Sequence, residues 1–436
     1  MAEPASPASA SPAADHLRRI KAIFIGSCGN LIEWYDFYSY TAFALYFAGI
    51  FFPKGDVLAQ QLNAAVIFAV GFFARPFGGW LFGHLADRYG RRRALTLSVT
   101  VMCFGSLMIA ACPSYNAIGI AAPVVLCLAR IIQGLSLGGE YGTSATYLCE
   151  VADRAHRGFY SSFQYVTLIG GQLTAIFVLL ALQHLLSPDQ LTSWGWRIPF
   201  VIGALLSVMG AVMRRTLHET EQFVDLTKEV KRENPLRTLA RYPREVAIVI
   251  GLTMGGTLAF YVFTTYMQKF MKLSVGLTFV QSTYVTAGSL VFALLLQPLY
   301  GALSDKIGRK PLLIAFGVVG TLATVPLLTL LHDMKGPWGC LLLVCIAWAF
   351  VSGYTSINSV VKAELFPTEV RATGVAVPYA VAVSLFGGTA ESIALWFKQI
   401  GHEHYFYYYV SGCIFISLMV YVLMRDTRKT SRIDTD

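Results

Sequence analysis

The stretch GHLADRYGRR, residues 83–92, returns about half a chain later as GALSDKIGRK, residues 301–310. Both copies share the pattern G-x-L-x-D-x-x-G-R-[RK], and each ends a long apolar run. Their separation is close to half of the 436 residues. A repeat with this period predicts a duplicated chain that consists of two related halves.

A second echo supports the duplication. An acid precedes an arginine by seven residues twice, as Glu150 with Arg157 and as Glu364 with Arg371. Each pair follows one copy of the first motif, in the same order. Between the two halves lies a charged stretch, residues 215–244, whose segment TLHETEQFVDLTKEVKREN reads as a short surface helix. The two echoes together favour a plan of two six-helix halves around a shared site.

The composition around these motifs is that of a membrane protein. The chain is 55% hydrophobic and only 14% charged, with a mean hydropathy of +0.57, whereas soluble domains carry about 25% charged residues. Residues 94–129, 311–331 and 336–361 hold no charge. A helix needs about 20 apolar residues to cross a bilayer. We therefore predict an all-α polytopic membrane protein.

Charged residues and Gly/Pro breaks divide the apolar sequence into twelve predicted spans. Their approximate limits are 22–51, 60–86, 94–113, 118–149, 158–186, 194–214, 245–270, 278–303, 311–332, 337–362, 371–398 and 404–424. The predicted organisation is a disordered tail over 1–17, a first bundle over 18–214, a linker over 215–244, a second bundle over 245–425 and a tail over 426–436.

The basic residues orient these spans. With both termini in the cytoplasm, about 26 lysines and arginines fall on the cytoplasmic side and about 6 on the outer side, which is the bias that membrane insertion favours. The cytoplasmic group includes Lys362 and Arg371. Arg75 and Arg130 fall inside spans and belong to neither side. This bias also explains the net charge of +9, so we expect no nucleic-acid partner.

The sequence offers no cofactor or metal site. It has no G-x-x-x-x-G-K-[ST] loop, so gradients of ions or substrates are expected to supply the driving force. Eight cysteines lie in or beside apolar spans without metal-like spacing, and we expect them to be packing residues. They are Cys28, Cys103, Cys112, Cys127, Cys149, Cys340, Cys345 and Cys413.

The first span carries two acids, Glu33 and Asp36, in GNLIEWYDF. An acid facing lipid costs roughly 2.5–3.5 kcal/mol, so these side chains should face the bundle interior. At 1.5 Å per residue, Asp36 and Arg130 reach similar depths, about 20 Å and about 18 Å from the ends where their spans begin. We predict that they pair and that Asp36 carries a proton; a static pair is the alternative. Glu33 is either a second proton carrier or a hydrogen-bonded helper.

Arg75 is the first candidate for substrate binding. It lies near the middle of its span, and its own helix face shows no acid. A guanidinium presents a planar fork that matches a carboxylate. The alternative is that Arg75 pairs with Glu33 or Glu140; Glu140 is itself a candidate for proton relay.

The second half provides weaker candidates. Lys269 lies near the outer end of its span, where it either extends to the interface or binds a distal carboxylate. Glu391 is a lone acid and a candidate secondary proton site. Further candidate cavity donors are Gln164, Gln172, Tyr165, Tyr261 and Tyr266. For each of them taken alone, packing is the favoured alternative.

The duplicated motif at residues 83–92 and 301–310 resembles the signature of the major facilitator superfamily. This resemblance implies twelve transmembrane helices in two six-helix bundles that open alternately to either side. It also implies cytoplasmic gates, in which acids and arginines bond across helix ends. One gate would contain Asp87, Arg91, Glu150 and Arg157, and the other Asp305, Arg309, Glu364 and Arg371. A purely interfacial anchoring role is the alternative.

A closer resemblance, to the metabolite:proton symporters of that superfamily, covers nearly the whole chain. It rests on GNLIEWYDFY, ARPFGGWLFGHLADRYGRR, RIIQGLSLGGEYGTSATY, WGWRIPF and KAELFP, and on FQYVTLIGGQL and TTYMQKF. It implies a monomeric, proton-coupled importer of a small dicarboxylate, first of all α-ketoglutarate (2-oxoglutarate), in a bacterial inner membrane. Citrate, shikimate or a zwitterionic osmolyte such as proline or betaine are the alternative substrates.

Overall fold

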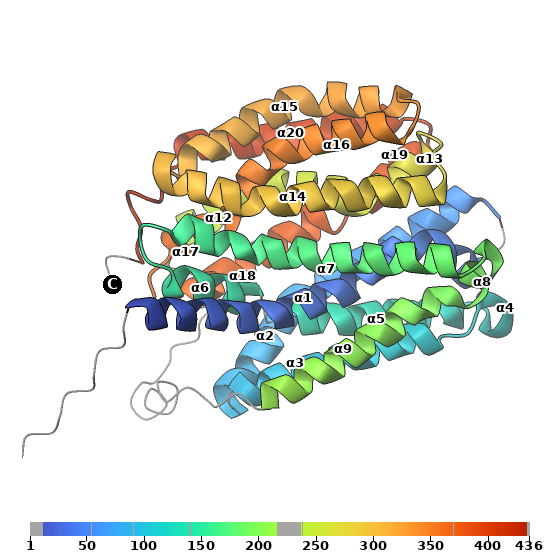
Figure 1. Cartoon of the computed structure of the whole chain (residues 1–436), viewed down its shortest axis with the longest axis horizontal. Helices are drawn as coiled ribbons and strands as arrows, with labels where there is room; N and C mark the ends of the chain where they lie inside the picture. The colour runs from blue at the N-terminus through green and yellow to red at the C-terminus, as the bar shows by residue number, and fades with distance from the viewer. Residues whose placement is uncertain are drawn as a thin grey trace, which may run out of the picture.

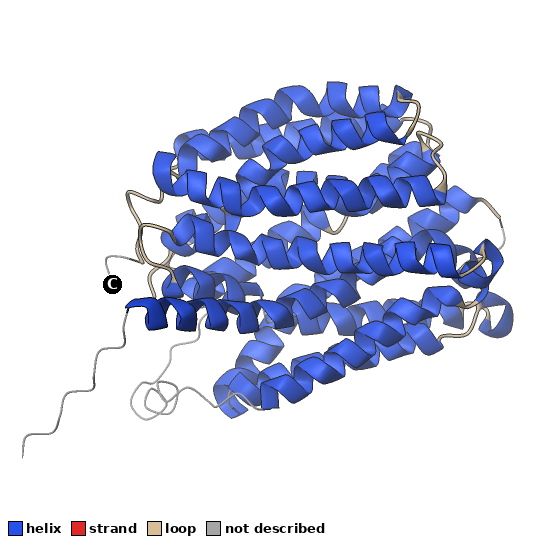
Figure 2. Ribbon diagram, viewed as in Figure 1, coloured by secondary structure: helices blue, strands red, loops and turns tan. Residues whose placement is uncertain are grey.

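The computed structural model describes residues 12–53, 55–89, 91–138, 141–215, 237, 239–368 and 370–433. Within them, side chains are not described for 12–29, 83–84, 86–89, 91–95, 143, 147, 151 and 213–215. Every regular element in the described ranges is a helix, as Figure 2 shows. The predicted surface helix within residues 215–244 falls largely outside these ranges.

The first half contains seven long helices and three short elements. They are α1 (Pro12–Phe51), α2 (Val57–Tyr89), α3 (Arg91–Ala111), α4 (Tyr115–Ile118), α5 (Ala121–Gly138), α6 (Tyr141–Val151), α7 (Arg157–Leu185), α8 (Pro188–Ser193), η1 (Gly195–Arg197) and α9 (Ile198–Arg215).

The second half repeats this plan with more interruptions. Its elements are α12 (Pro243–Tyr261), η2 (Val262–Tyr266), α13 (Met267–Leu273), α14 (Phe279–Ile307), α15 (Arg309–Asp333), α16 (Pro337–Thr355), α17 (Asn358–Leu365), α18 (Arg371–Ala382), η3 (Val383–Gly387), α19 (Ala390–Gln399) and α20 (Glu403–Leu423). The long helices run side by side through the bundle (Figure 1).

Ten helices in the described ranges are long and apolar enough to cross a membrane, and Thr96–Ala111 is a shorter apolar helix. The outer surface is correspondingly apolar. Leu185 is 78% exposed, Trp338 80% and Leu423 81%. Large apolar surfaces of this kind mark contact with another apolar phase, which for a bundle of apolar helices is lipid.

One of the predicted spans is broken in the middle within the described residues. The span 337–362 contains α16 and α17, which are separated after Thr355. Two other spans contain the π-helical segments η2 and η3. Irregular backbone inside a membrane bundle is tolerated where it lines a site.

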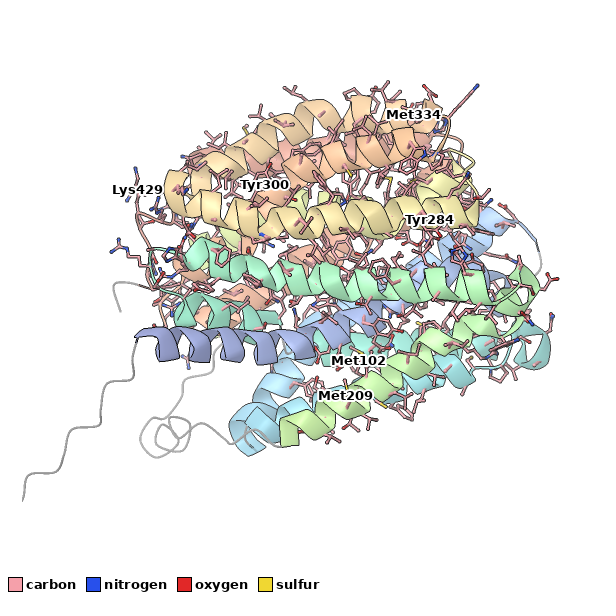
Figure 3. The ribbon with its side chains drawn as sticks, viewed as in Figure 1. Met102, Met209, Tyr284, Tyr300, Met334 and Lys429 are labelled. Carbon is pink, nitrogen blue, oxygen red and sulfur yellow. The ribbon has the colours of Figure 1, made fainter. Side chains whose placement is uncertain are left out.

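The two halves meet along α7 and α14. At the end of the bundle where α1 begins and α20 ends, called here the termini end (left in Figure 1), Gly158 of α7 faces Gly301 of α14. A Cβ atom on Gly301 would lie 2.6 Å from the Gly158 carbonyl oxygen. The two helices can therefore approach this closely only because both contact positions are glycine. At the opposite end, called the distal end, His184 Nε2 lies 2.6 Å from Tyr284 Oη. Figure 3 labels Tyr284 and Tyr300 toward the two ends of α14.

Candidate functional site

Asp36 lies fully buried in the first half, on the face of α1 that points into the bundle. Its Oδ2 accepts hydrogen bonds from Ser106 Oγ and from Gln133 Nε2, the latter at 3.1 Å. Its Oδ1 has no hydrogen-bond partner in the described structure and lies against α9, where a Cβ on Gly203 would come within 2.1 Å of it. Because glycine has no side chain, Gly203 leaves room for the carboxylate.

Arg130 does not contact Asp36 directly, contrary to the predicted pairing. Arg130 Nη1 donates to Gln133 Oε1 at 2.6 Å, and Gln133 then donates to Asp36. Gln133 follows Arg130 by one helical turn and offers both a donor and an acceptor, so its amide fits between the two charges. The Arg130 guanidinium also lies over the rings of Phe37 at 4.1 Å and Tyr40 at 4.6 Å.

Arg75 is a buried cation that rests on aromatic rings. It is 4% exposed, and its Cζ lies 4.0 Å from the ring centroid of Phe72, 4.5 Å from that of Phe37 and 4.9 Å from that of Trp34. Its Nε and Nη2 atoms have no protein acceptor, and the ion pairs between described residues do not include it. A guanidinium in this setting is a candidate anion site, since buried donors are normally satisfied by a partner.

Of the two acids predicted as partners of Arg75, the structure describes only Glu33. Glu33 is buried on α1, at 1% exposure, and it forms no ion pair with Arg75 in the described structure. Glu140 lies outside the described residues.

Lys269 and Glu391 form a buried ion pair in the second half. Each side chain is 1% exposed, so Lys269 does not extend to the membrane interface. Glu391 Oε2 keeps no hydrogen-bond partner in the described structure. The pair joins α13 to α19, the two segments that follow the π-helical interruptions η2 and η3.

The other predicted donors are buried, but their hydrogen bonds differ. Tyr266 Oη donates to Glu403 Oε1 at 3.2 Å, which engages it at the distal end. Gln164 Oε1 accepts from Ser144 Oγ at 2.8 Å while its Nε2 has no protein partner. Tyr261 Oη and Gln172 Oε1 also have no protein partner in the described structure, so both remain available to a ligand or to water.

Lys362 is a buried cation that the sequence analysis assigned to the cytoplasmic side. It is 0% exposed on α17, and its Nζ donates to Tyr141 Oη at 2.8 Å. Its Nζ also lies 3.6 Å from the ring centroid of Tyr379. The region around Asn358 could have indicated that Lys362 is buried. Span ten breaks there, and the helical segment after the break, α17, runs into the interior.

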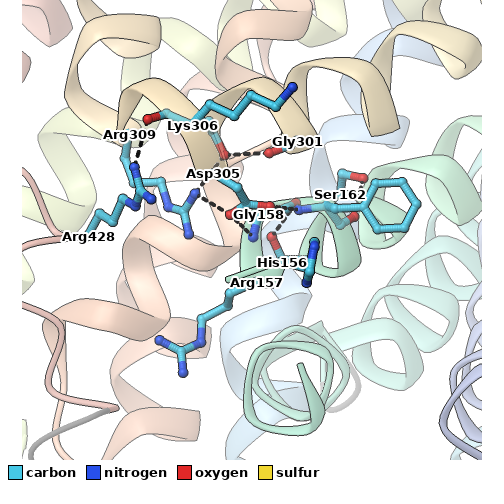
Figure 4. A network of polar contacts seen from close by, with 12 residues as sticks. His156, Arg157, Gly158, Ser162, Gly301, Asp305, Lys306, Arg309 and Arg428 are labelled. Atoms are coloured by element: carbon cyan, nitrogen blue, oxygen red, sulfur yellow. Dashed lines mark hydrogen bonds and ion pairs between the residues drawn. The ribbon is translucent and has the colours of Figure 1, made fainter. Parts of the chain in front are cut away.

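The predicted gate residues Asp305 and Arg309 of the second half lie together at the termini end (Figure 4) and contact Glu364. Arg309 Nη1 lies 2.8 Å from Asp305 Oδ1, and Arg309 Nη2 lies 3.4 Å from Glu364 Oε1. Asp305 also accepts from the backbone N–H groups of Gly158 at 2.7 Å and Phe159 at 2.9 Å. These N–H groups begin α7, so a carboxylate of the second half caps a helix of the first half.

The two predicted gates are joined rather than separate. Arg371, assigned to the second gate, bonds to Glu150 of the first at 2.7 Å. The side chains of Asp87 and Arg91 lie outside the described residues. Arg157 donates to Ser431 Oγ at 3.4 Å, and Thr427 Oγ1 donates to Glu364 Oε2 at 2.6 Å.

Ser431 and Thr427 belong to the segment after α20, for which the sequence predicts only a tail. The segment crosses the termini end, and its Arg432 carbonyl accepts from Arg371 Nη2 at 3.3 Å. The closed arrangement at this end therefore includes three parts of the chain: both halves and the segment after α20.

Comparison with known proteins defines the class. The sequence profile of the Major Facilitator Superfamily matches residues 37–390 and 250–434, and the chain belongs to this superfamily of membrane transporters. The α-ketoglutarate permease of Escherichia coli (strain K12) is 50% identical over 420 residues, covering 96% of this chain and 96% of the relative. The citrate-proton symporter of Klebsiella pneumoniae is 33% identical over 376 residues, covering 85% of this chain and 83% of that protein.

Other relatives and a solved structure agree with this class. The proline/betaine transporter of Escherichia coli (strain K12) is 30% identical over 424 residues, covering 93% of this chain and 83% of that protein. The proton:xylose symporter XylE, solved with 6-bromo-6-deoxy-D-glucose, superposes with a TM-score of 0.74 at 19% identity, covering 96% of this chain and 98% of that one. At this identity the superposition shows a shared fold.

Proposed function

We propose that this protein is a proton-coupled importer of a small dicarboxylate, α-ketoglutarate, in a bacterial inner membrane. The observation that carries the proposal is Arg75, a buried guanidinium whose neighbours are aromatic rings rather than acids. The relative with 50% identity that is named for this substrate supports the choice of dicarboxylate. The protein works as a monomer of twelve transmembrane helices, with both termini in the cytoplasm.

Arg75 binds one carboxylate of the substrate. Its Nε and Nη2 atoms point away from any protein acceptor, and a carboxylate accepts two parallel N–H bonds from such a fork. Aromatic rings on one side hold the guanidinium without neutralising it. Nearby donors without protein partners, Gln164 Nε2 and Tyr261 Oη, are available to the remaining oxygens of the substrate.

Asp36 carries the coupled proton. Because Arg130 reaches it only through Gln133, a small movement of either side chain changes the electrostatic support for the carboxylate. Arg130 close by favours the ionised acid, whereas Arg130 drawn toward substrate favours the protonated acid. Glu33 and Glu391 are secondary proton sites in this account, and Glu140 is a relay.

Electrical work sets the requirement for protons. Each elementary charge moved across the membrane is worth about 2.3 kcal/mol per 100 mV. A dianion entering alone would oppose an inside-negative potential. Two accompanying protons remove this opposition, and a third makes the potential favourable.

The halves rock around the central site by alternating access. The network of Asp305, Arg309 and Glu364 and the Glu150–Arg371 pair closes the termini end, which we place in the cytoplasm. Asp87, Arg91 and Arg157 belong to the same gate. In this account the contacts at the termini end form a closed cytoplasmic gate, and substrate enters from the outer side.

Uptake of labelled 2-oxoglutarate into proteoliposomes, with and without an imposed pH gradient, tests the proposal. We expect accumulation above equilibrium only when the outside is more acidic. Unlabelled citrate, shikimate, proline and betaine compete in parallel assays, because relatives named for citrate and for proline/betaine make these the alternative substrates. Accumulation that ignores the gradient would contradict proton coupling, and stronger competition by citrate or betaine would reassign the substrate.

A further inference from the structure

Lys362 has the properties of a second anion-binding cation. Its side chain is fully buried on α17. Within the described ranges its polar contact is the Tyr141 hydroxyl at 2.8 Å, and it lies over the rings of Tyr379 at 3.6 Å and Tyr141 at 4.7 Å. The ion pairs between described residues do not include Lys362.

This environment does not account for a charged lysine by itself. Taking an unpaired charge out of water costs more free energy than a desolvated cation recovers by lying over an aromatic face. The other buried lysine of the second half, Lys269, solves the problem with a carboxylate. The comparison shows that Lys362 lacks the partner that a purely structural buried lysine has in this same protein.

Lys362 and Arg75 belong to opposite halves, and each lies on aromatic rings at the interface between them. Arg75 rests on Phe72 of the first half, whose ring packs against Tyr261 of the second at 5.1 Å between centroids. Lys362 lies on the ring of Tyr379 in the second half, which stacks on Tyr141 of the first. Both cations therefore border ring contacts that cross from one half to the other.

The backbone around Lys362 supports a site as well. Lys362 lies in α17, directly after the break in span ten. The ring of Tyr141 in α6 stacks on Tyr379 of α18 at 3.8 Å between centroids, and its hydroxyl accepts from Lys362 of α17, so a residue of the first half contacts two helices of the second. An interrupted helix inside a membrane bundle is a usual location of a transporter's binding site.

We propose that Lys362 binds the second carboxylate of the dicarboxylate, while Arg75 binds the first. This inference rests on the proposed function. The substrate then bridges the first half through Arg75 and the second half through Lys362, and its length becomes a requirement for binding. A monocarboxylate of the same chain length satisfies Arg75 alone and leaves Lys362 without an anion.

The test compares two ligands that differ only at one end. They are 2-oxoglutarate and 2-oxopentanoate, in which a methyl group replaces the distal carboxylate. Affinities are measured by competition against labelled 2-oxoglutarate, or by calorimetry where competition is too weak. The proteins are the purified full-length wild type, Lys362→Met, Lys362→Arg and, as a matched control, Lys335→Met, which removes an exposed lysine.

For Lys362→Met we expect the affinity for 2-oxoglutarate to fall roughly 10- to 100-fold, the range of a lost charged hydrogen bond. Its affinity for 2-oxopentanoate should stay within about threefold, so the preference for the dicarboxylate collapses. Lys362→Arg should keep part of the preference, and Lys335→Met all of it. The ratio of the two affinities is taken within one preparation, so a partly misfolded sample does not change it.

Three results would overturn the inference. In the first, Lys362→Met binds both ligands as the wild type does. In the second, it loses affinity for both equally, which indicates a structural role. In the third, the wild type binds no dicarboxylate, which removes the proposed function and this inference together; the first two remove the inference alone. If Lys362→Met does not fold, the same comparison is made with Lys362→Arg, which should keep part of the preference for the dicarboxylate. An equal loss of affinity for both ligands would contradict the inference.

Discussion

Asp36 and Arg130 are joined through Gln133, whose amide donates to one and accepts from the other. All three side chains are fully buried. A direct ion pair in a low-dielectric interior would be hard to separate. An amide between the charges gives each of them a hydrogen bond and lets either one change partner, which is what coupling a proton to a cargo requires.

Gln133→Ala should therefore affect both stability and coupling. The substitution removes hydrogen bonds to Asp36, Arg130 and Ser106. Leaving these buried groups without a partner is expected to lower the free energy of unfolding by about 1–3 kcal/mol. The check is thermal unfolding of the purified protein, followed by uptake driven by a pH gradient. The exposed Gln399→Ala is the control, and equal behaviour of the two variants would argue against the bridge.

Asp305→Asn should open the termini end more than Glu150→Gln. Asp305 caps α7 and holds Arg309 in a buried setting, where charged hydrogen bonds contribute about 1.5–3 kcal/mol. The Glu150 side chain is 42% exposed, and exposed pairs contribute about 0–1 kcal/mol. Spin labels at the exposed positions Ala155 and Ile307 report the opening as a longer distance population.

The order of these effects is the decisive feature. An equal shift in both variants, or a larger shift for Glu150→Gln, would contradict the assignment of Asp305 as the main bond between the halves. Asp333→Asn, at an exposed position, provides the control in which the label distances do not change.

Gly158→Ala should prevent full closure at the termini end. A Cβ there would lie 2.2 Å from Ser304 Oγ and 2.7 Å from the Gly301 carbonyl, so α7 and α14 must separate. Overpacking of this kind costs about 1–3 kcal/mol. The same label pair should report it. Gly412→Ala in α20 meets nothing within 4 Å and should instead stabilise the protein by about 0.5–1 kcal/mol; a closed Gly158→Ala protein would refute the close-packing argument.

Thr427→Val should weaken the gate, although Thr427 lies after α20 and outside the helices of both halves. Thr427 is buried, and its hydroxyl donates to Glu364, which also pairs with Arg309. Loss of a hydrogen bond to a charged group corresponds to about 1.5–3 kcal/mol. We expect a longer distance population for the label pair at Ala155 and Ile307 than in the protein without the substitution. An unchanged distance would mean that the segment after α20 does not hold the gate closed.

The fold and the main charges were accessible from sequence because each has a one-dimensional signature. The repeated motif fixed the twofold plan, and isolated charges inside apolar runs drew attention to Asp36, Arg75 and Arg130. Depth along a helix follows from residue counting, so the proximity of Asp36 and Arg130 could be anticipated. Gln133 could not, because an amide inside an apolar run carries no charge to mark it.

The burial of Lys362 and Lys269 was not predicted, for a related reason. Counting from span ends puts a lysine near a boundary into a loop or at the interface. The break before α17 turns Lys362 inward, and Glu391 holds Lys269 in the interior. The crossing of the two gates through Glu150 and Arg371 depends on how the halves pack, which sequence spacing within each half does not record.

Asp36→Asn in proteoliposomes tests the central claim, that one buried carboxylate couples the proton to the cargo. Two rates are measured on the same vesicles: exchange of labelled for unlabelled 2-oxoglutarate at equal pH, and accumulation driven by an imposed pH gradient. Asp333→Asn is the control. The account predicts that Asp36→Asn retains exchange and loses accumulation; an Asp36→Asn protein that still concentrates 2-oxoglutarate in response to the gradient would contradict it.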